Sequence, residues 1–252
     1  MKKFLLIATI LLINSANVFA EEGHSKKVEW GYSGNTGPEH WGDLSAEFAT
    51  CKTGKNQSPI NISNDVIEVN LPEIDFKYSM LTPDKIVNTG HSIQVDMWSG
   101  GEITIDGKVF ELKQFNFHTP SEITMGGKPA PLEADFVHLN EAGEIVVVAM
   151  LFEPGIEDRT LAALVKSMPI AIGQENRLDS KALEHMDSEF KTNNYFRFNG
   201  SLTTPPCTEG VRWIVMKSPM TISKTQLEAF QKALKHPNAR PVQPLNARIV
   251  SQ

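Results

Sequence analysis

Residues 114–118 read QFNFH and residues 133–138 read EADFVH, and these two stretches decide the fold that the sequence predicts. Polar and apolar side chains alternate through most of both stretches, and successive side chains of a β-strand point to opposite faces. The residues that share a face are Gln114, Asn116 and His118 in the first stretch and Glu133, Asp135 and Val137 in the second. Two neighbouring strands of this kind predict a cluster of polar side chains on one side of a sheet.

The residues around these stretches carry further strand patterns. Residues 93–97 alternate between apolar and polar side chains, which is the period of a half-buried strand. Asp106-Gly107 lies between two strand-like segments and predicts a two-residue hairpin turn. The continuous apolar run of residues 145–152 is typical of a central strand that is covered on both faces.

Helical patterns are few and lie outside these strands. Residues 159–168 place Leu161, Leu164 and Val165 on one face of a predicted helix. Ser223 and Gln226 form a capping box that predicts the start of a second helix. Its buried stripe consists of Leu227, Phe230 and Leu234. Many strands and few helices predict a mainly β (α+β) fold, a single domain built on a large twisted, mostly antiparallel central sheet with peripheral helices.

Residues 1–20 have the pattern of a secretory signal peptide. A positively charged start precedes a short apolar run, and residues 18–20, VFA, offer small side chains where a signal peptidase reads them. The alternative is a membrane anchor, which needs about 20 apolar residues. We expect cleavage after Ala20, a domain of residues 21–252, and a periplasmic or secreted protein without a membrane anchor.

The composition excludes some classes of partner. The chain has 252 residues, with 24 basic and 30 acidic side chains and a net charge of −6. A length of this size fits one sizeable domain. A net acidic chain without a basic cluster argues against nucleic acid or an anionic membrane surface as a partner.

Cys51 and Cys207 are the two cysteines of the chain. In an exported protein such a pair is expected to be oxidised. A bond between cysteines so far apart would close a long loop and stabilise the fold by roughly 4–5 kcal/mol in the chain-entropy model. Two separate free thiols are the alternative.

Three further segments join the two stretches in one pattern: residues 37–41, GPEHW; residues 57–62, QSPINI; and residues 200–206, GSLTTPP. With these segments the chain resembles the α-class carbonic anhydrases, from about residue 30 to about residue 248. The resemblance implies a central twisted sheet, an active site in a conical cleft, one zinc ion, and the interconversion of carbon dioxide and bicarbonate. It also implies a disulfide between Cys51 and Cys207.

The resemblance places three zinc-ligand histidines at Asn116, His118 and Asp135, and only His118 keeps the family residue. Three imidazoles hold a catalytic zinc and leave its fourth position to water, for which carbonic anhydrase is itself the general example. The Asn116 amide oxygen is a poor zinc ligand and is too short to replace the far nitrogen of an imidazole. The Asp135 carboxylate has the reach of the near ring nitrogen. We therefore expect Asp135 to be able to bind metal and Asn116 not to bind it.

Gln114 and Glu133 match the residues that hold the ligand imidazoles by hydrogen bonds. Here Glu133 and Asp135 put two carboxylates on one strand face, and two buried neighbouring acids do not both stay charged at low cost. A cation, a water or a proton is expected between them, unless the strand is solvated at the surface. Taken alone, His118 is also typical of a hydrogen-bonded core histidine. His138 is expected to pack on the opposite face.

Three residues match the family's catalytic groups outside the metal. By resemblance, Thr203 orients the zinc-bound hydroxide, Glu122 holds that threonine, and His91 is the proton shuttle, a role that suits the ordinary pKa of histidine. Taken singly, residues 203–206 are also typical of a turn, and His91 of a surface histidine.

The substrate pocket of the family is matched as well. Thr204 corresponds to a neighbour of the substrate. The apolar wall for carbon dioxide is matched by Val137, Val147, Leu202, Val211 and Trp213. Tyr32 corresponds to the tyrosine of the solvent network, whereas Ile123 and Phe198 stand where the family carries a histidine and a tyrosine.

These observations support three hypotheses for the function of this protein. The first is an exported α-carbonic anhydrase with carbon dioxide and bicarbonate as substrates. The second is a catalytically silent binding or structural module of the same fold. The third is a site for a harder metal, held by Asp135, His118 and water. We expect a carbonic anhydrase-type protein with weakly bound or absent zinc and low or absent hydratase activity. Its oligomeric state is left open.

Overall fold

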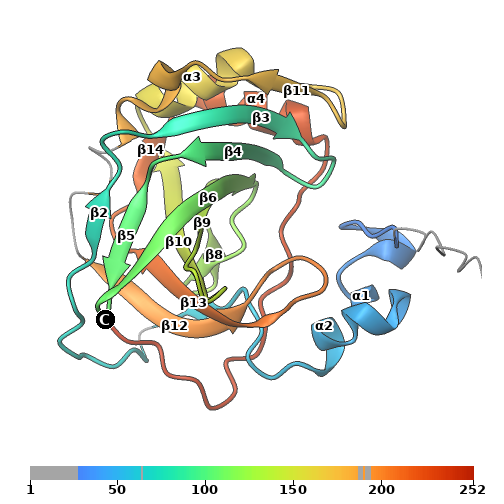
Figure 1. Cartoon of the computed structure of the whole chain (residues 1–252). Coiled ribbons are helices and arrows are strands. Elements are labelled where there is room, and N and C mark those ends of the chain that lie inside the picture. Colours follow the sequence, from blue (N-terminus) through green and yellow to red (C-terminus); the bar gives the residue numbers. More distant parts are fainter. Residues whose placement is uncertain (1–27, 64, 187–189, 191–193) are drawn as a thin grey trace, which may run out of the picture.

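The computed structural model describes residues 28–63, 65–186, 190 and 194–252. The predicted signal peptide, residues 1–20, lies outside the described residues. Among the helices of the described part, none has the length and apolar character that crossing a membrane requires. The described chain forms the β-rich body shown in Figure 1.

One twisted sheet dominates the structure. Its strands within the described residues are β2 (Asp75–Lys77), β3 (Thr82–Asn88), β4 (Ile93–Ser99), β5 (Glu102–Ile105), β6 (Lys108–His118), β9 (Leu132–Leu139), β10 (Ile145–Pro154), β11 (Glu175–Arg177), β12 (Tyr195–Ser201), β13 (Glu209–Met216) and β14 (Met220–Ile222). The main path runs β11-β3-β4-β6-β9-β10-β13-β12. β10 pairs in parallel with β13 and β14, and the other pairs of this sheet are antiparallel. The predicted fold class is confirmed.

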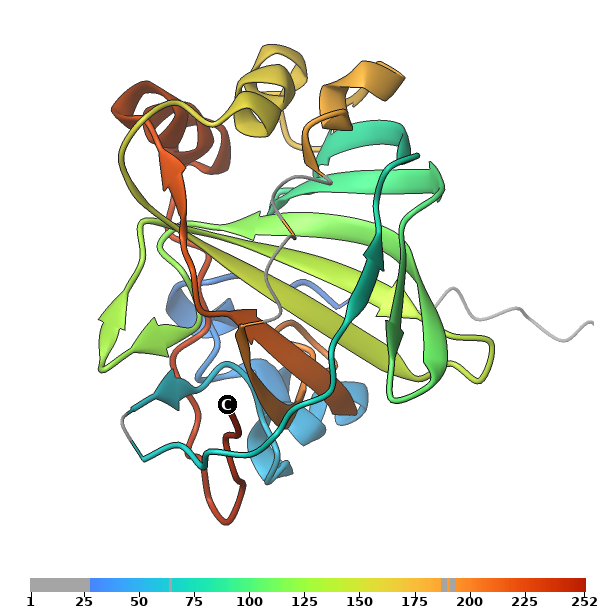
Figure 2. The ribbon, with the colours of Figure 1, turned by 90° about the vertical axis from the view of Figure 1, so that its left-hand side faces the viewer.

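The helices and a small second sheet lie around this sheet. The small sheet contains β1 (Asn61–Ile62), β7 (Thr124–Met125) and β8 (Lys128–Pro129). The helices are η1 (Gly34–Thr36), α1 (Trp41–Leu44), η2 (Ala46–Phe48), α2 (Thr50–Thr53), α3 (Arg159–Ser167), η3 (Ser180–Leu183) and α4 (Lys224–Leu234). α3, α4 and η3 lie together above β3 in Figures 1 and 2, and α1 and α2 lie well away from them. The predicted peripheral position of the helices is confirmed.

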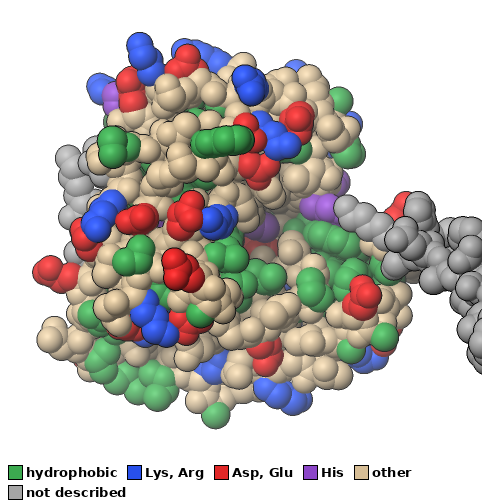
Figure 3. Space-filling model, viewed as in Figure 1, with side chains coloured by type: hydrophobic (Ala, Val, Ile, Leu, Met, Phe, Trp, Pro, Cys, Tyr) green, Lys and Arg blue, Asp and Glu red, His purple; other side chains and the backbone are tan. Residues whose placement is uncertain are grey.

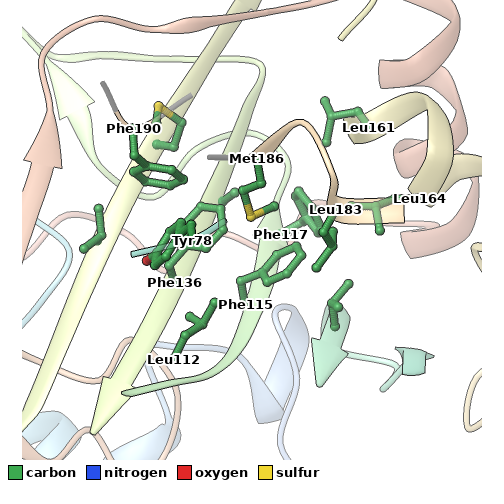
Figure 4. Packing of buried hydrophobic residues seen from close by; sticks show 14 of the residues in the cluster. Tyr78, Leu112, Phe115, Phe117, Phe136, Leu161, Leu164, Leu183, Met186 and Phe190 are labelled. Atoms are coloured by element: carbon green, nitrogen blue, oxygen red, sulfur yellow. The ribbon is translucent and has the colours of Figure 1, made fainter. Parts of the chain in front are cut away.

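Two hydrophobic cores cover the two faces of the sheet, and β10 contributes to both. Val146, Val148, Met150 and Phe152 of β10 belong to the larger core, which α3, α4 and η3 close. The intervening β10 residues belong to the smaller core, and they are Val147, Ala149 and Leu151. Figure 4 shows aromatic side chains of β6 and β9 gathered with Leu183 and Met186 in the larger core. This two-sided burial explains the continuous apolar run of residues 145–152.

The predicted hairpin and capping box are both present. Asp106 and Gly107 connect β5 to β6 with φ values of 53° and 74°, the left-handed conformation that a tight turn of this kind requires. Ser223 caps α4, because its hydroxyl accepts a hydrogen bond from the Gln226 amide at 3.3 Å while Gln226 Oε1 accepts one from the Ser223 amide at 3.1 Å.

A disulfide joins the N-terminal segment to the loop after β12. Cys51 of α2 is bonded to Cys207, 156 residues further along the chain. The predicted pairing is confirmed, and the alternative of two free thiols is wrong.

Candidate metal centre

The paired strands β6 and β9 bring the predicted polar residues together. In their antiparallel register Asn116 lies opposite Asp135, and His118 lies opposite Glu133. Relative exposure is 2% for His118, 0% for Glu133 and 3% for Asp135. A solvated surface strand, which the sequence left open, is therefore excluded. The smaller core, which β9 and β10 share with β13, lies on this side of the sheet.

His118 presents one ring nitrogen to this cluster. Its Nδ1 lies 2.8 Å from the Asn238 carbonyl oxygen, which can only accept, so Nδ1 donates and Nε2 keeps a free lone pair. Nε2 lies 3.5 Å from Glu122 Oε2 and 3.7 Å from Asp135 Oδ2. Burial lowers the pKa of His118, so the ring is neutral at pH 7 and has the protonation state of a metal ligand.

Asp135 and Glu133 are neighbouring buried carboxyl groups, and both have raised pKa values. Burial, and then the charge of Glu133, raise the pKa of Asp135 well above its usual range. Burial also raises the pKa of Glu133 to about 7. Two buried neighbouring acids with raised pKa values favour a proton on one of them. Glu133 Oε2 accepts from the amides of Glu122 and Ile123 at 2.6 and 2.9 Å.

Asn116 makes a hydrogen bond within its own strand. Its Nδ2 donates to Gln114 Oε1 at 3.3 Å. Gln114 therefore holds an amide in the place where the resemblance implies an imidazole. Asn116 is half-buried and lies opposite Asp135.

Glu122 lies on the other side of His118 and is held by the C-terminal segment. Its Oε1 accepts from the Arg240 amide at 2.7 Å, and the nearby Thr203 side chain lowers the pKa of the same carboxyl group. Burial raises the pKa of Glu122 to about 8. Burial, and then the charges of Glu122 and Asp135, raise the pKa of Tyr32.

The predicted apolar wall is assembled in the smaller core. Val147, Val211 and Trp213 are buried there, and Val137 and Leu202 pack against them as partly buried residues. Ile123 and Phe198 belong to the same core, and Phe198 stacks on Trp213 with ring centroids 5.9 Å apart. The two departures from the family pattern thus fill space in an apolar wall. Thr204, the predicted neighbour of the substrate, is partly buried beside Thr203.

His91 lies apart from the metal-type residues, at the surface. Its ring stacks on Trp30 with ring centroids 3.7 Å apart, and Tyr32 lies at 6.5 Å. The two stacked rings, with Val28, Glu29 and Thr36, line a cavity of about 380 Å³. Figure 3 shows histidine and hydrophobic side chains beside one another around a hollow on this face of the molecule.

His138 has the predicted position on the opposite face of β9. It is fully buried, its Nε2 lies 2.5 Å from the Tyr78 hydroxyl, and its ring stacks on that of Tyr78. Burial lowers the pKa of His138 to about 4. His138 is therefore a packing residue of the larger core.

Comparison with known proteins places this arrangement in a family. The sequence profile of the eukaryotic-type carbonic anhydrases matches residues 36–252. A carbonic anhydrase of Neisseria gonorrhoeae is 43% identical over 246 residues, covering 96% of this chain and 95% of that protein. The chain belongs to the α-carbonic anhydrase family.

Solved structures agree with this membership. The α-carbonic anhydrase of Thermovibrio ammonificans, in complex with the inhibitor sulfanilamide, has a TM-score of 0.83 and 47% identity, covering 90% of this chain and 100% of that chain. The α-carbonic anhydrase of Photobacterium profundum has a TM-score of 0.82 and 47% identity, covering 89% and 100%. Membership supports carbon dioxide and bicarbonate as substrates and zinc as cofactor, by resemblance.

The donors in this chain do not fit a three-imidazole zinc centre. One imidazole, His118, faces the cluster, and its neighbours there are carboxyl groups. At Asn116, the first of the three ligand positions that the resemblance implies, the side-chain amide makes a hydrogen bond to Gln114. Tetrahedral zinc prefers nitrogen and sulfur donors, whereas carboxylate and amide oxygens suit harder cations.

Three contributions to the site are not foreseen from the sequence. Asn238 orients His118 and also donates from Nδ2 to the carbonyls of His91 and Phe117, both at 2.9 Å. Arg240 holds Glu122 through its backbone amide. Neither residue lies in a motif. The third is the 3.5 Å approach of Glu122 to His118, for which the only sequence signal is their spacing of four residues.

Proposed function

We propose that this chain is an α-carbonic anhydrase-type protein whose hydration of carbon dioxide is low or absent. One observation carries the proposal: among the residues that the structure describes, His118 is the single imidazole that converges on the candidate metal centre. Loss of two of three ligands weakens binding and removes the geometry that a catalytic zinc needs. Zinc is therefore expected to bind weakly or not at all.

The groups that would act beside a metal are present in this chain. The Thr203 side chain lies near the Glu122 carboxyl group, which would hold the threonine oxygen in one orientation. The apolar wall of Val147, Val211 and Trp213 would exclude water from a bound carbon dioxide molecule. His91 would receive a proton at the surface. These roles come from the family resemblance.

The alternative is a catalytically silent module that uses the same cleft for binding or for structure. The specific observation in its favour is that an assembled apolar wall lies beside a donor set that does not suit zinc. The two proposals predict different responses to repair of the ligands.

We infer further that residues 1–20 are a signal peptide and residues 21–252 the mature domain, in the periplasm or outside the cell. The disulfide between Cys51 and Cys207 supports this, because such bonds persist in oxidising compartments. N-terminal sequencing of the protein from a periplasmic extract tests the cleavage site after Ala20.

The proposed function is tested by repair of the ligands. Asn116→His together with Asp135→His supplies two imidazoles beside His118, and Glu133 regains an imidazole partner in place of a carboxyl group. We expect carbon dioxide hydration, followed by stopped-flow pH change, to rise by orders of magnitude over the unmodified chain. Zinc should then survive dialysis against a chelator. Asp135→His alone should give a smaller gain because one ligand is still missing.

His118→Ala in the repaired protein is the control and should abolish the gain. A double variant that holds zinc and stays inactive would favour the silent module, with Ile123 and Phe198 as the next residues to restore. An unmodified chain that already equals the double variant in hydration rate would refute the proposal.

A further inference from the structure

Within the described residues, one group of side chains has the composition and spacing of a cation site: His118, Glu122 and Asp135. We propose that these three bind one divalent cation of the oxygen-preferring class, such as Mn²⁺, with Glu122 as the third ligand in place of Asn116. This inference rests on the proposed function, since it requires that the chain lacks the family's zinc centre.

The distances between the three ligand atoms fit a single ion. Nε2 of His118 lies 3.5 Å from Glu122 Oε2 and 3.7 Å from Asp135 Oδ2, and one ligand atom from each of the three residues lies within 4.8 Å of the other two. For three atoms with these two separations and a third of at most 4.8 Å, the equidistant point in their plane is at most about 2.4 Å from each, and points above or below the plane lie farther away. Bonds from divalent cations to protein oxygens are about 2.0–2.6 Å long. No backbone movement is needed to bring the three atoms around an ion.

A second observation points to a ligand at this place. Glu122 Oε2 is completely buried, faces His118 Nε2, and has no hydrogen-bond partner in the described structure. Buried polar atoms are usually satisfied, so such an oxygen in a closed cluster calls for a partner. A cation between Glu122, His118 and Asp135 supplies that partner.

Residues behind two of the three ligands hold them in place. Asn238 fixes the His118 ring through Nδ1, and the Arg240 amide holds the other oxygen of Glu122. Such supporting contacts are characteristic of metal centres. The donor set of two carboxylates and one imidazole is richer in oxygen than a zinc site of three imidazoles, which favours the harder ion.

This assignment also gives Glu122 a different role. In the family arrangement its carboxyl group holds Thr203, and here that group would be shared with a cation. The same residues would therefore bind a cation and give poor hydratase activity, because Glu122 would no longer serve Thr203 alone.

Mn²⁺ binding to the metal-stripped full chain tests the inference, with electron paramagnetic resonance reporting the free ion. We expect one Mn²⁺ per chain. Glu122→Gln, which keeps the shape of the side chain and an oxygen for the Arg240 amide, should weaken binding at least roughly 100-fold. Asp135→Asn should weaken it similarly. Asn116→Ala should change the affinity less than about threefold, and Glu153→Gln, an exposed carboxylate of β10, is the matched control. Circular dichroism verifies that each variant is folded.

Absence of Mn²⁺ binding, or binding to folded Glu122→Gln with unchanged affinity, would overturn the inference. A loss of affinity in Asn116→Ala as large as that in Glu122→Gln would overturn it too, because Asn116 would then be the ligand. None of these outcomes affects the proposed function, which fails only if the unmodified chain hydrates carbon dioxide rapidly.

Discussion

Buried titratable side chains set the chemistry of this protein at the scale of single residues. Glu122, Glu133 and Asp135 lie around His118 with almost no solvent contact, and burial is the largest cause of the raised pKa of each carboxyl group. On the other face of β9, burial lowers the pKa of His138. The same physical effect, the cost of desolvating a charge, thus raises the pKa of the acids and lowers the pKa of the histidines.

His138 makes folding stability depend on pH. Its pKa is about 4 in the folded protein and about 6.5 in an unfolded chain. Between these values the unfolded chain binds more protons, so the free energy of unfolding falls as the pH drops from 6.5 to 4, by roughly 3 kcal/mol from this residue. His138→Gln keeps a polar atom near Nε2 for the Tyr78 hydroxyl but does not titrate. Urea denaturation across this range should show a smaller loss of stability in the variant.

The matched control is His236→Gln, because His236 is exposed. That variant should follow the pH dependence of the unmodified protein. If the free energy of unfolding of His138→Gln falls with decreasing pH as steeply as that of the unmodified protein, another group causes the acid sensitivity.

At the scale of elements, the helices are held to the sheet by specific contacts at their first turns. Gln226 completes the capping box of α4, and its Nε2 also donates to the Asp158 carbonyl at 2.6 Å. Asp158 in turn caps α3 by accepting from the Leu161 amide at 2.7 Å. One side chain therefore joins the starts of both helices that close the larger core.

Removal of the cap should weaken this arrangement. Ser223→Ala leaves the Gln226 amide without its side-chain acceptor and is expected to lower the free energy of unfolding by about 1 kcal/mol. Thr225→Ala, at an exposed position in the same turn, should change it by less than about 0.5 kcal/mol. Chemical denaturation of both variants measures the difference. Equal effects would show that the cap hydroxyl contributes nothing specific.

At the scale of the whole molecule, two links tie the N-terminal segment to the rest of the chain. The disulfide joins Cys51 to Cys207. The Arg240 guanidinium donates to the Ser58 carbonyl at 2.7 Å and to the Cys51 carbonyl at 3.0 Å, and its backbone amide holds Glu122. The candidate metal centre is thereby connected to both ends of the described chain.

Breaking the disulfide should lower the free energy of unfolding by more than the substitutions at the candidate metal centre do. The bond closes a loop across 156 residues, for which the chain-entropy model gives a stabilisation of about 5 kcal/mol. Cys51→Ser with Cys207→Ser should therefore unfold at clearly lower denaturant concentration. A reducing agent should shift the unmodified protein in the same direction and leave the double variant unchanged. A shift of the double variant on reduction would indicate a different origin.

The local sequence pattern by itself determined much of the secondary structure of this protein. Alternation in residues 93–97, the Asp106-Gly107 turn, the apolar run of β10 and the capping box of α4 each predicted the observed element, because each depends on neighbours a few residues apart. The shared faces of β6 and β9 likewise followed from strand periodicity. The order of motifs indicated the family, which the comparisons confirm.

Only the tertiary structure decided how the polar residues meet. Asn238 and Arg240 reach His118 and Glu122 from more than a hundred residues away, and no local pattern encodes such contacts. The raised pKa values of Glu133 and Asp135 depend on burial, since in water both carboxyl groups would be ionised at pH 7. The approach of Glu122 to His118 depends on the course of the chain between them, which their spacing of four residues does not define. Packing brings these donors together, and desolvation then sets their protonation.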